Sequence, residues 1–185
     1  WVQSNIAQEE AQLNLTESVI DYGSPAGFSA ESMIGIRFKV EGEGDNGYSE
    51  FYDTVDTVIM GRRTYDWLLE QESESFPYED KECYVFSRTV SKDNENVKFF
   101  SENVVDFTNQ LKNKEGKNIW VMGGGDLIHS FINDKLVDEM IITVSPVLIG
   151  KGIPLFKEVD FETELTLKSI NRFNQFAELH YEVKR

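Results

Sequence analysis

The chain has 185 residues, and with 40% of them apolar it can bury one core and is too apolar for a disordered protein. Its formal net charge of −15 opposes binding to nucleic acid or anionic membrane, so neither is expected as a partner. One cysteine and two histidines exclude a disulfide framework and leave no metal site to expect. No apolar run reaches the roughly 20 residues of a membrane span. We therefore expect a soluble, cytoplasmic protein with a single domain over residues 1–185.

The N-terminal part of this sequence is the hardest to interpret, above all residues 1–32. Residues 6–20 have a weak helical pattern, and residues 33–40 alternate between apolar and polar side chains as a half-buried strand does. An acidic, glycine-rich loop over residues 41–47 follows. A short helix is then expected around residues 48–55.

From residue 57 the chain alternates between short apolar runs, typical of buried strands, and amphipathic segments, typical of helices. The expected strands are 57–60, 83–86, 97–100 and 118–122, and the expected helices are 63–71, 103–111 and 127–133. In the first of these helices Tyr65, Leu68 and Leu69 should point inward. Three further strands, 139–148, 164–170 and 177–183, follow without helices. This order predicts an α/β fold whose mixed, mostly parallel sheet is flanked by helices and gains antiparallel strands near the C-terminus.

Residues 42–47, Gly-Glu-Gly-Asp-Asn-Gly, match the glycine fingerprint of dinucleotide-binding folds. Glu43 and Asp45 would face a pyrophosphate, which is better bound by neutral amides at a helix N-terminus. The helix that follows is also too short for a crossover between parallel strands. We interpret the motif as a turn-rich loop.

The segment Gly61-Arg62-Arg63-Thr64 lies where a buried strand ends and a helix begins. Backbone amides and a threonine hydroxyl at such a point can bind an anion, and arginines can hold a phosphate through two hydrogen bonds. The alternative is that both arginines are solvated residues of the first helical turn. Cations are unfavourable at a helix N-terminus unless an anion accompanies them, which favours the anion site.

Two further motifs follow buried strands. Ser87-Arg88-Thr89 follows one strand, and Gly123-Gly124-Gly125 lies between another strand and a helix. Ligands of open α/β sheets bind beyond the carboxyl ends of the strands, and glycines let the backbone approach a ligand closely. The alternatives are a surface arginine and a tight turn, although a tight turn needs fewer than three glycines. No nucleophilic site is expected, because Cys83 lies inside an apolar strand.

These motifs, in this order, resemble those of the dihydrofolate reductase superfamily. The segments that carry the resemblance are 58–65, 85–88 and 119–127, and 147–156 is similar to the branch that includes the C-terminal reductase domain of the riboflavin-pathway deaminase-reductase. The resemblance covers about residues 41–185. It implies a three-layer reductase fold and an NADPH cofactor, with a homodimer as a family-level expectation.

The resemblance also implies roles for particular residues. Arg62 and Arg88 would hold the adenosine 2′-phosphate, with Ser87 beside it. Thr64 and the amides from Gly123 to Leu127, including those of Gly124, Gly125 and Asp126, would hold the pyrophosphate. The bond between Gly123 and Gly124 would be the cis peptide of the family.

The substrate side departs from that pattern. The apolar strand and closing loop with which the family begins are not recognisable in residues 1–40. An acidic residue expected before the Gly-Arg motif could be Asp45 or Glu50, and Ile128 stands where folate reductases have a tyrosine. Thr143 matches a threonine near the folate ring.

Two functions are therefore open at the level of the sequence. The first is an NADPH-dependent reductase of a pterin-like or aminopyrimidine-like small molecule, with Asp45, Glu50 and Thr143 as candidate catalytic residues. The second is a nucleotide-binding module of the same fold without turnover. The resemblance does not name the substrate.

Overall fold

The computed structural model describes residues 43–70, 75–89, 92–101, 103–123, 125–146, 156 and 162–184. The helix expected over residues 6–20 and the strand expected over residues 33–40 lie outside these ranges. Contacts within the chain define two compact units, residues 1–48 with 137–185 and residues 49–136, and each is described by itself. In the described ranges no helix is long and apolar enough to cross a membrane.

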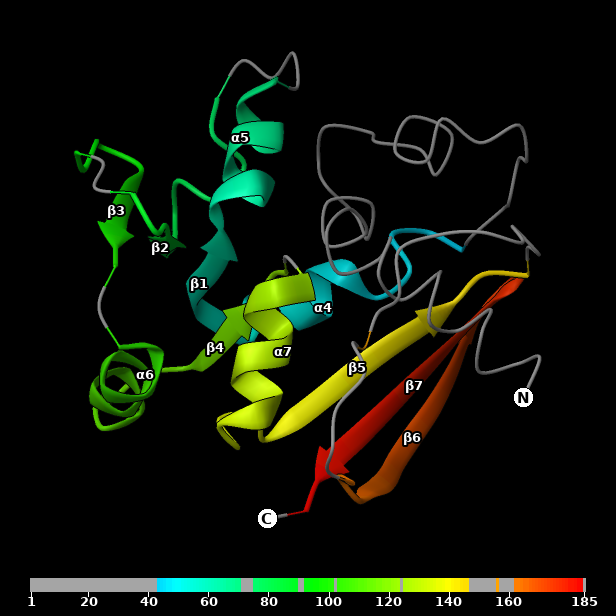
Figure 1. Ribbon diagram of the computed structural model, residues 1–185. Coiled ribbons are helices and arrows are strands. Elements are labelled where there is room, and N and C mark those ends of the chain that lie inside the picture. Colours follow the sequence, from blue (N-terminus) through cyan, green and yellow to red (C-terminus); the bar gives the residue numbers. More distant parts are fainter. Residues whose placement is uncertain are drawn as a thin grey trace. The chain divides into compact units, whose positions relative to one another are not determined.

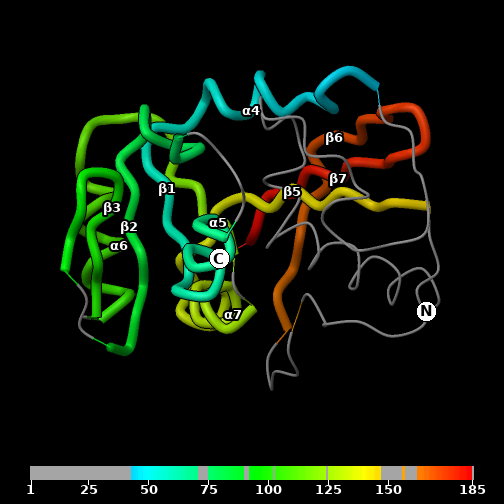
Figure 2. Tube along the Cα trace, turned by 90° about the horizontal axis from the view of Figure 1, so that it is seen from above, coloured from blue at the N-terminus to red at the C-terminus, as the bar shows by residue number. Residues whose placement is uncertain are grey.

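The unit of residues 49–136 is built on a four-stranded parallel sheet. Its strands are β1 (Val55–Gly61), β2 (Glu82–Phe86), β3 (Val97–Phe100) and β4 (Asn118–Val121). The order across the sheet is β3-β2-β1-β4, so β1 is paired on both sides. Seen from above, β3, β2 and β1 follow one another in that order (Figure 2).

Helices cover both faces of this sheet (Figure 1). They are α5 (Arg62–Glu70), α6 (Val104–Lys112) and α7 (Gly125–Asn133), and the short α4 (Tyr48–Asp53) leads into β1. Tyr65 of α5 contacts Phe99 of β3, whereas Phe107 of α6 contacts Phe100. Successive residues of a strand point to opposite faces, so α5 and α6 lie on opposite sides. Because α7 contacts α6, the layers are helix, sheet and helix.

Burial on both faces explains why the strands read as continuous apolar runs. Val58, Ile59 and Met60 of β1 have no exposed surface, and Val85 of β2 is equally buried. Helix α6 begins where Asn103 caps it, because the Asn103 side chain accepts a hydrogen bond of 2.8 Å from the amide of Val105.

The prediction that Leu69 points inward is wrong. The buried side of α5 carries Thr64, Tyr65 and Leu68, whereas Leu69 is 59% exposed. At 100° per residue, Leu69 lies about a quarter-turn from the middle of the arc that the other three define. The hydroxyl residue Thr64 occupies the inward position instead.

The other unit contains an antiparallel sheet of β5 (Glu139–Val144), β6 (Leu165–Phe173) and β7 (Phe176–Val183) in the order β5-β7-β6. Met140, Val144, Phe156 and Tyr181 pack around Ile142 on one face. The pairing of β6 with β7 shifts at Lys168, and the Lys168 ammonium contacts the Glu139 carboxylate of β5. His180 of β7 lies 2.8 Å from the second oxygen of Glu139, so one carboxylate joins three strands.

The α/β fold of dihydrofolate reductase type is confirmed, as is the change from parallel to antiparallel strands. In the described part of the chain these strands form two sheets rather than one mixed sheet.

Candidate cofactor-binding site

Three of the motifs singled out in the sequence lie at one edge of the parallel sheet. The amide of Gly61, at the end of β1, donates a hydrogen bond of 3.0 Å to the carbonyl of Gly123, just beyond β4. Gly61 is also in register with Phe86, the last residue of β2, and Ser87 comes next. The strands are parallel, so this shared edge is their carboxyl edge.

The strand order marks one position on that edge. From β1 the chain continues to β2 and β3 on one side, and then returns to place β4 on the other side of β1. In open α/β sheets the crevice at such a reversal is where ligands bind. Gly61 and Gly123 stand on its two sides, which makes this position the candidate site.

Two helices begin beside it. Helix α5 starts at Arg62, directly after β1, and α7 starts at Gly125, shortly after β4. The first amides of a helix have no partner within the helix and carry a partial positive charge, so they attract phosphate oxygens. Gly123 has φ of 107°, a conformation that side-chain-bearing residues rarely adopt. The predicted cis bond involves Gly124, which lies outside the described residues.

Thr64, in the first turn of α5, has a buried hydroxyl that no described residue satisfies. The residue is 2% exposed, and its Oγ1 has no hydrogen-bond partner within the described ranges. An unmade hydrogen bond of a buried polar group costs about 1–3 kcal/mol. A phosphate oxygen bound at this helix N-terminus would provide the missing partner, so the residues present fit a phosphate-bearing cofactor.

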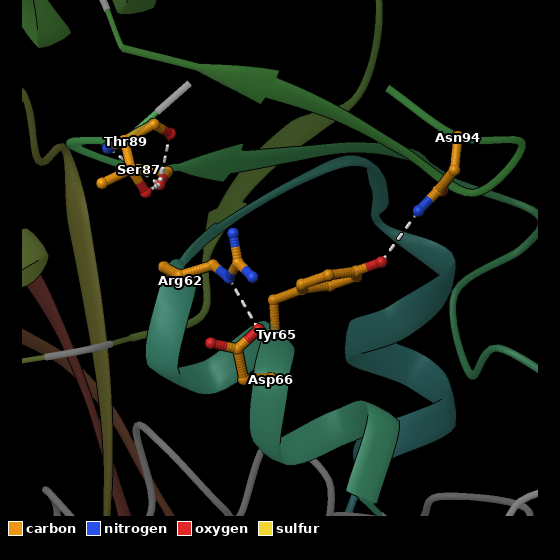
Figure 3. A network of polar contacts seen from close by, with 6 residues as sticks. All are labelled: Arg62, Tyr65, Asp66, Ser87, Thr89 and Asn94. Carbon is orange, nitrogen blue, oxygen red and sulfur yellow. Dashed lines mark hydrogen bonds and ion pairs between the residues drawn. The ribbon is translucent and has the colours of Figure 1, made fainter. Parts of the chain in front are cut away.

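Two of the contacts of Arg62 help to locate its guanidinium group. Its Nε lies 2.6 Å from Oδ1 of Asp66, one helical turn further along α5 (Figure 3). Its guanidinium carbon lies 5.5 Å from the ring centroid of Phe99 on β3, within the range of a cation–π interaction. Arg63 and Arg88 are both exposed, Arg63 in the first turn of α5 and Arg88 directly after Ser87.

Ser87 is buried, and its hydroxyl is engaged within its own loop. It donates a hydrogen bond of 2.8 Å to the carbonyl of Thr89 and accepts one of 3.3 Å from the Thr89 amide (Figure 3). Further along the chain, the Asn94 amide group donates to the hydroxyl of Tyr65 at 2.8 Å, which ties Asn94 to α5. The bonds of Ser87 shape the turn that carries Arg88, and the contact of Ser87 with a phosphate stays a prediction.

The first turn of α7 contains the remaining cofactor candidates. Asp126 is exposed, and an acidic residue in the first turn is favourable to the helix. Leu127 is buried, so its backbone amide rather than its side chain is the group that could meet a ligand. Ile128, which stands where folate reductases have a tyrosine, is buried as well.

The acidic loop before α4 is a series of turns, in agreement with the interpretation of its sequence. The amide of Glu43 donates to the Asn46 side chain at 2.8 Å, and the amide of Gly47 donates to the Asp45 carboxylate at 3.1 Å. The amides of Asn46 and Tyr48 donate to backbone carbonyls of the same loop. Because these amides are already used, they cannot cradle a pyrophosphate.

The candidate catalytic residues lie in different units. Asp45 and Thr143 belong to the unit of residues 1–48 and 137–185, whereas Glu50 belongs to the unit of the cofactor candidates. Glu50 is exposed in the first turn of α4, and Thr143 is buried on β5 opposite Glu178. Their roles stay predictions.

Cys83 and the acidic residues provide no alternative chemistry in the described part of the chain. Burial, together with the charges of Asp80 and Glu82, raises the pKa of the Cys83 thiol to about 12, so it is protonated and inert near neutral pH. In the same ranges, no group of three or more histidine, cysteine or acidic residues could hold a metal ion.

Some residues at this edge were missed in the sequence. Asp66 could have been found, because an acidic residue four positions after an arginine on a helix is a recognisable ion-pair spacing. Phe99 and Asn94 could not, because their contacts with α5 depend on which strand lies beside which.

Comparison with known proteins agrees with this geometry. Residues 53–177 match the model of the RibD C-terminal domain, a reductase-like family. Two uncharacterised proteins of Bacillus subtilis (strain 168) are similar to the chain. YwjB is 51% identical over 76% of this chain and 81% of its own length, and YyaP is 36% identical over 69% and 72%.

A solved structure shares the fold. It belongs to a candidate riboflavin biosynthesis protein of Shewanella sp. PV-4, with a TM-score of 0.69 and 30% identity over 77% of this chain and 81% of that chain. The strand order and the three motifs at one sheet edge agree with the family match. The chain belongs to the RibD C-terminal domain family.

Proposed function

We propose that the chain is an NADPH-dependent reductase that transfers hydride to a small heteroaromatic molecule of the pterin or aminopyrimidine type. The observation that carries the proposal is the buried Thr64 hydroxyl, which no described residue satisfies, in the first turn of α5 at the edge where β1 meets β4. A polyphosphate is the ligand class that such an edge attracts. Reductase domains of this family generally bind NADPH, so NADPH is the polyphosphate that we propose as the ligand.

Each part of the cofactor has candidate ligands in the chain. Thr64 and the first amides of α7 would hold the pyrophosphate. Arg62 and Arg88 would hold the 2′-phosphate, with Arg63 and Ser87 nearby. The bound cofactor supplies the hydride, and the work of the protein is to hold the nicotinamide and the substrate in a reactive geometry and to exclude water.

The substrate is proposed to meet carboxylates rather than cations. An ionised carboxylate accepts hydrogen bonds from the amino groups of a pterin or aminopyrimidine ring, and a protonated one could supply the proton that accompanies the hydride. Asp45 and Glu50 are the candidates, and Thr143 could hydrogen-bond the ring.

The test has two stages. The protein is first titrated with NADPH and with NADH, and oxidation of NADPH is then followed with a panel of pterins and aminouracils. Tighter binding of NADPH and its oxidation with one class of compound would support the proposal. Cofactor binding without oxidation across the panel would favour a nucleotide-binding module, and absence of binding would contradict both.

The substrate side is tested on whichever compound is reduced. Asp45→Asn or Glu50→Gln should lower kcat and leave the affinity for NADPH nearly unchanged. Glu70→Gln, which changes an exposed acidic residue at the end of α5, is the matched control and should alter neither. Unchanged turnover in both Asp45 and Glu50 variants would remove them from the site.

A further inference from the structure

Asp66 is a charged residue at this edge to which the proposed function gives no role. Its pair with Arg62 is exposed, with 42% of the Arg62 side chain and 45% of the Asp66 side chain in solvent. Exposed pairs of this kind contribute little to stability. The pair also places its cation at the N-terminus of α5, where the helix dipole disfavours positive charge. Stability of the helix is therefore a poor explanation for the arrangement.

Two of the contacts of Arg62 involve different parts of its guanidinium group. Asp66 contacts Nε, and the ring of Phe99 lies near the central carbon. Phe99 belongs to β3, so the side chain of Arg62 reaches from the end of β1 past β2 along the sheet. The charge of Arg62 is thereby placed away from the crevice between β1 and β4.

Phe99 is itself well supported. Tyr65 packs edge-on against its ring, with centroids 5.4 Å apart and an interplanar angle of 88°. The hydroxyl of Tyr65 is held in turn by Asn94 (Figure 3). The ring beside the guanidinium group is therefore held by neighbouring side chains, and the hydrogen bond to Asp66 fixes the direction in which Nε of Arg62 points.

Because the guanidinium group is planar, the contact of Asp66 with Nε also determines where the terminal nitrogens of Arg62 point. Its donors lie in one plane, and the edge formed by the two terminal nitrogens faces a different direction from Nε. With Nε directed at Asp66, a phosphate that binds Arg62 through two hydrogen bonds would do so at the terminal edge. Without the contact with Asp66, the long side chain of Arg62 would have more conformational freedom to lose when it binds a phosphate.

We propose that Asp66 is a positioning residue that orients Arg62 for the 2′-phosphate and so contributes to the preference for NADPH over NADH. This inference rests on the proposed function. Asp66 touches neither reactant. It acts through the hydrogen bond to Nε of Arg62.

The experiment compares Kd values for NADPH and NADH in the parent protein and in Asp66→Ala and Asp66→Asn. Asp66→Ala should weaken NADPH binding by about three- to tenfold and leave NADH binding unchanged. Asp66→Asn keeps an oxygen that accepts from Nε and should retain most of the affinity. Asp106→Ala, which removes an exposed aspartate from the first turn of α6, is the control for net charge and should change neither Kd.

A double variant tests the route through Arg62. If Asp66 acts only by orienting that side chain, Asp66→Ala should cause no further loss of NADPH affinity in an Arg62→Ala background. An equal loss in both backgrounds would overturn the proposal.

The other outcomes separate the two hypotheses. A parent protein that does not prefer NADPH would overturn the proposed cofactor and the role of Asp66 together. A preference that survives unchanged in Asp66→Ala would overturn the role of Asp66 alone. Tighter NADPH binding in both Asp66 variants would also overturn it, because the carboxylate would then compete with the phosphate. Equal weakening of NADPH and NADH would assign Asp66 to the stability of α5.

Discussion

Gly61 and Gly123 are joined by a backbone hydrogen bond of 3.0 Å, although they are far apart in the sequence. The bond ties the end of β1 to the end of β4, and a helix begins shortly after each of them. Most of the groups proposed to bind the pyrophosphate belong to the main chain. Their positions therefore depend on the pairing of these strands more than on side-chain packing.

Replacing Thr64 with valine should separate stability from binding. The valine keeps the shape but removes a buried hydroxyl that no described residue satisfies, so the free energy of unfolding should stay equal or rise by up to about 1 kcal/mol. Binding of NADPH and NADH should weaken alike, by about ten- to a hundredfold, because both carry the pyrophosphate. Urea unfolding and cofactor titrations provide the two measurements.

Two controls accompany this variant. Thr64→Ser retains the hydroxyl and should bind both cofactors nearly as the parent does. Thr108→Val removes the other buried threonine hydroxyl without a partner in the described ranges, in α6. It should change stability only. Parent-like affinity in Thr64→Val would remove Thr64 from the pyrophosphate site.

Replacing Arg88 with alanine should affect one cofactor only. Hydrogen bonds to charged groups contribute about 1.5–3 kcal/mol, so NADPH should bind about ten- to a hundredfold more weakly while NADH is unaffected. Arg88 is exposed, so added salt should reduce the difference between the cofactors. Arg172→Ala, at an exposed arginine of β6, is the control. A loss of affinity shared by both cofactors would show that Arg88 does not read the 2′-phosphate.

The carboxylate that joins three strands predicts a pH dependence. Lys168, and to a lesser extent His180, hold the pKa of Glu139 below its ordinary value of 4.5 despite an opposing effect of burial. A lowered pKa in the folded state means that the contribution to stability is present above the unfolded-state pKa and disappears as the pH falls through the folded-state pKa. Glu139→Gln should therefore reduce stability at neutral pH and have no effect in acid.

This effect should stay below about 1 kcal/mol, because half of the Glu139 side chain is in solvent. Urea unfolding between about pH 7 and about pH 3 measures it. Glu162→Gln, at an exposed glutamate, should show no such trend. A difference between Glu139→Gln and the parent that grows in acid would contradict the assignment.

The thiol of Cys83 should be protected in the folded protein. A pKa of about 12 in place of 9.0 lowers the thiolate fraction near neutral pH by about a thousandfold, and burial restricts access further. Reaction with a chromogenic disulfide reagent should therefore be at least about a thousandfold slower in buffer than in denaturant. Rapid labelling of the native protein would show that β2 opens readily.

Local patterns of apolar and polar residues predicted the strands and helices well where a single physical rule, such as the burial of a short apolar run, governs them. Residues 97–100 were expected as a strand and form β3, because a short apolar run between polar segments has few other solutions. Leu69 was misplaced because apolar character alone cannot say which side of α5 faces the sheet. The inward position of Thr64 follows from the same packing, so the lack of a described partner for its hydroxyl could not be foreseen.

The site was predictable as a set of motifs but not as an arrangement. The sequence shows that Gly61 lies at the end of one strand and that Ser87 follows another. The pairing of β4 with β1 rather than β3 is not, because pairing between distant strands leaves no local periodic signal. The contact of Arg62 with Phe99 depends on that strand order and became apparent only with the structure.

The central position of β1 also has a consequence for synthesis of the chain. Strands β2 and β3 follow soon after β1, so one side of the sheet can form early, whereas the other side waits for Asn118–Val121. A nascent chain or fragment that stops before Asn118 would expose an unpaired edge of β1 beside its most apolar residues, and such edges promote aggregation. Fragments of this kind should need a chaperone or a solubilising partner, and the edge proposed to bind the cofactor should be among the last parts of the parallel sheet to form.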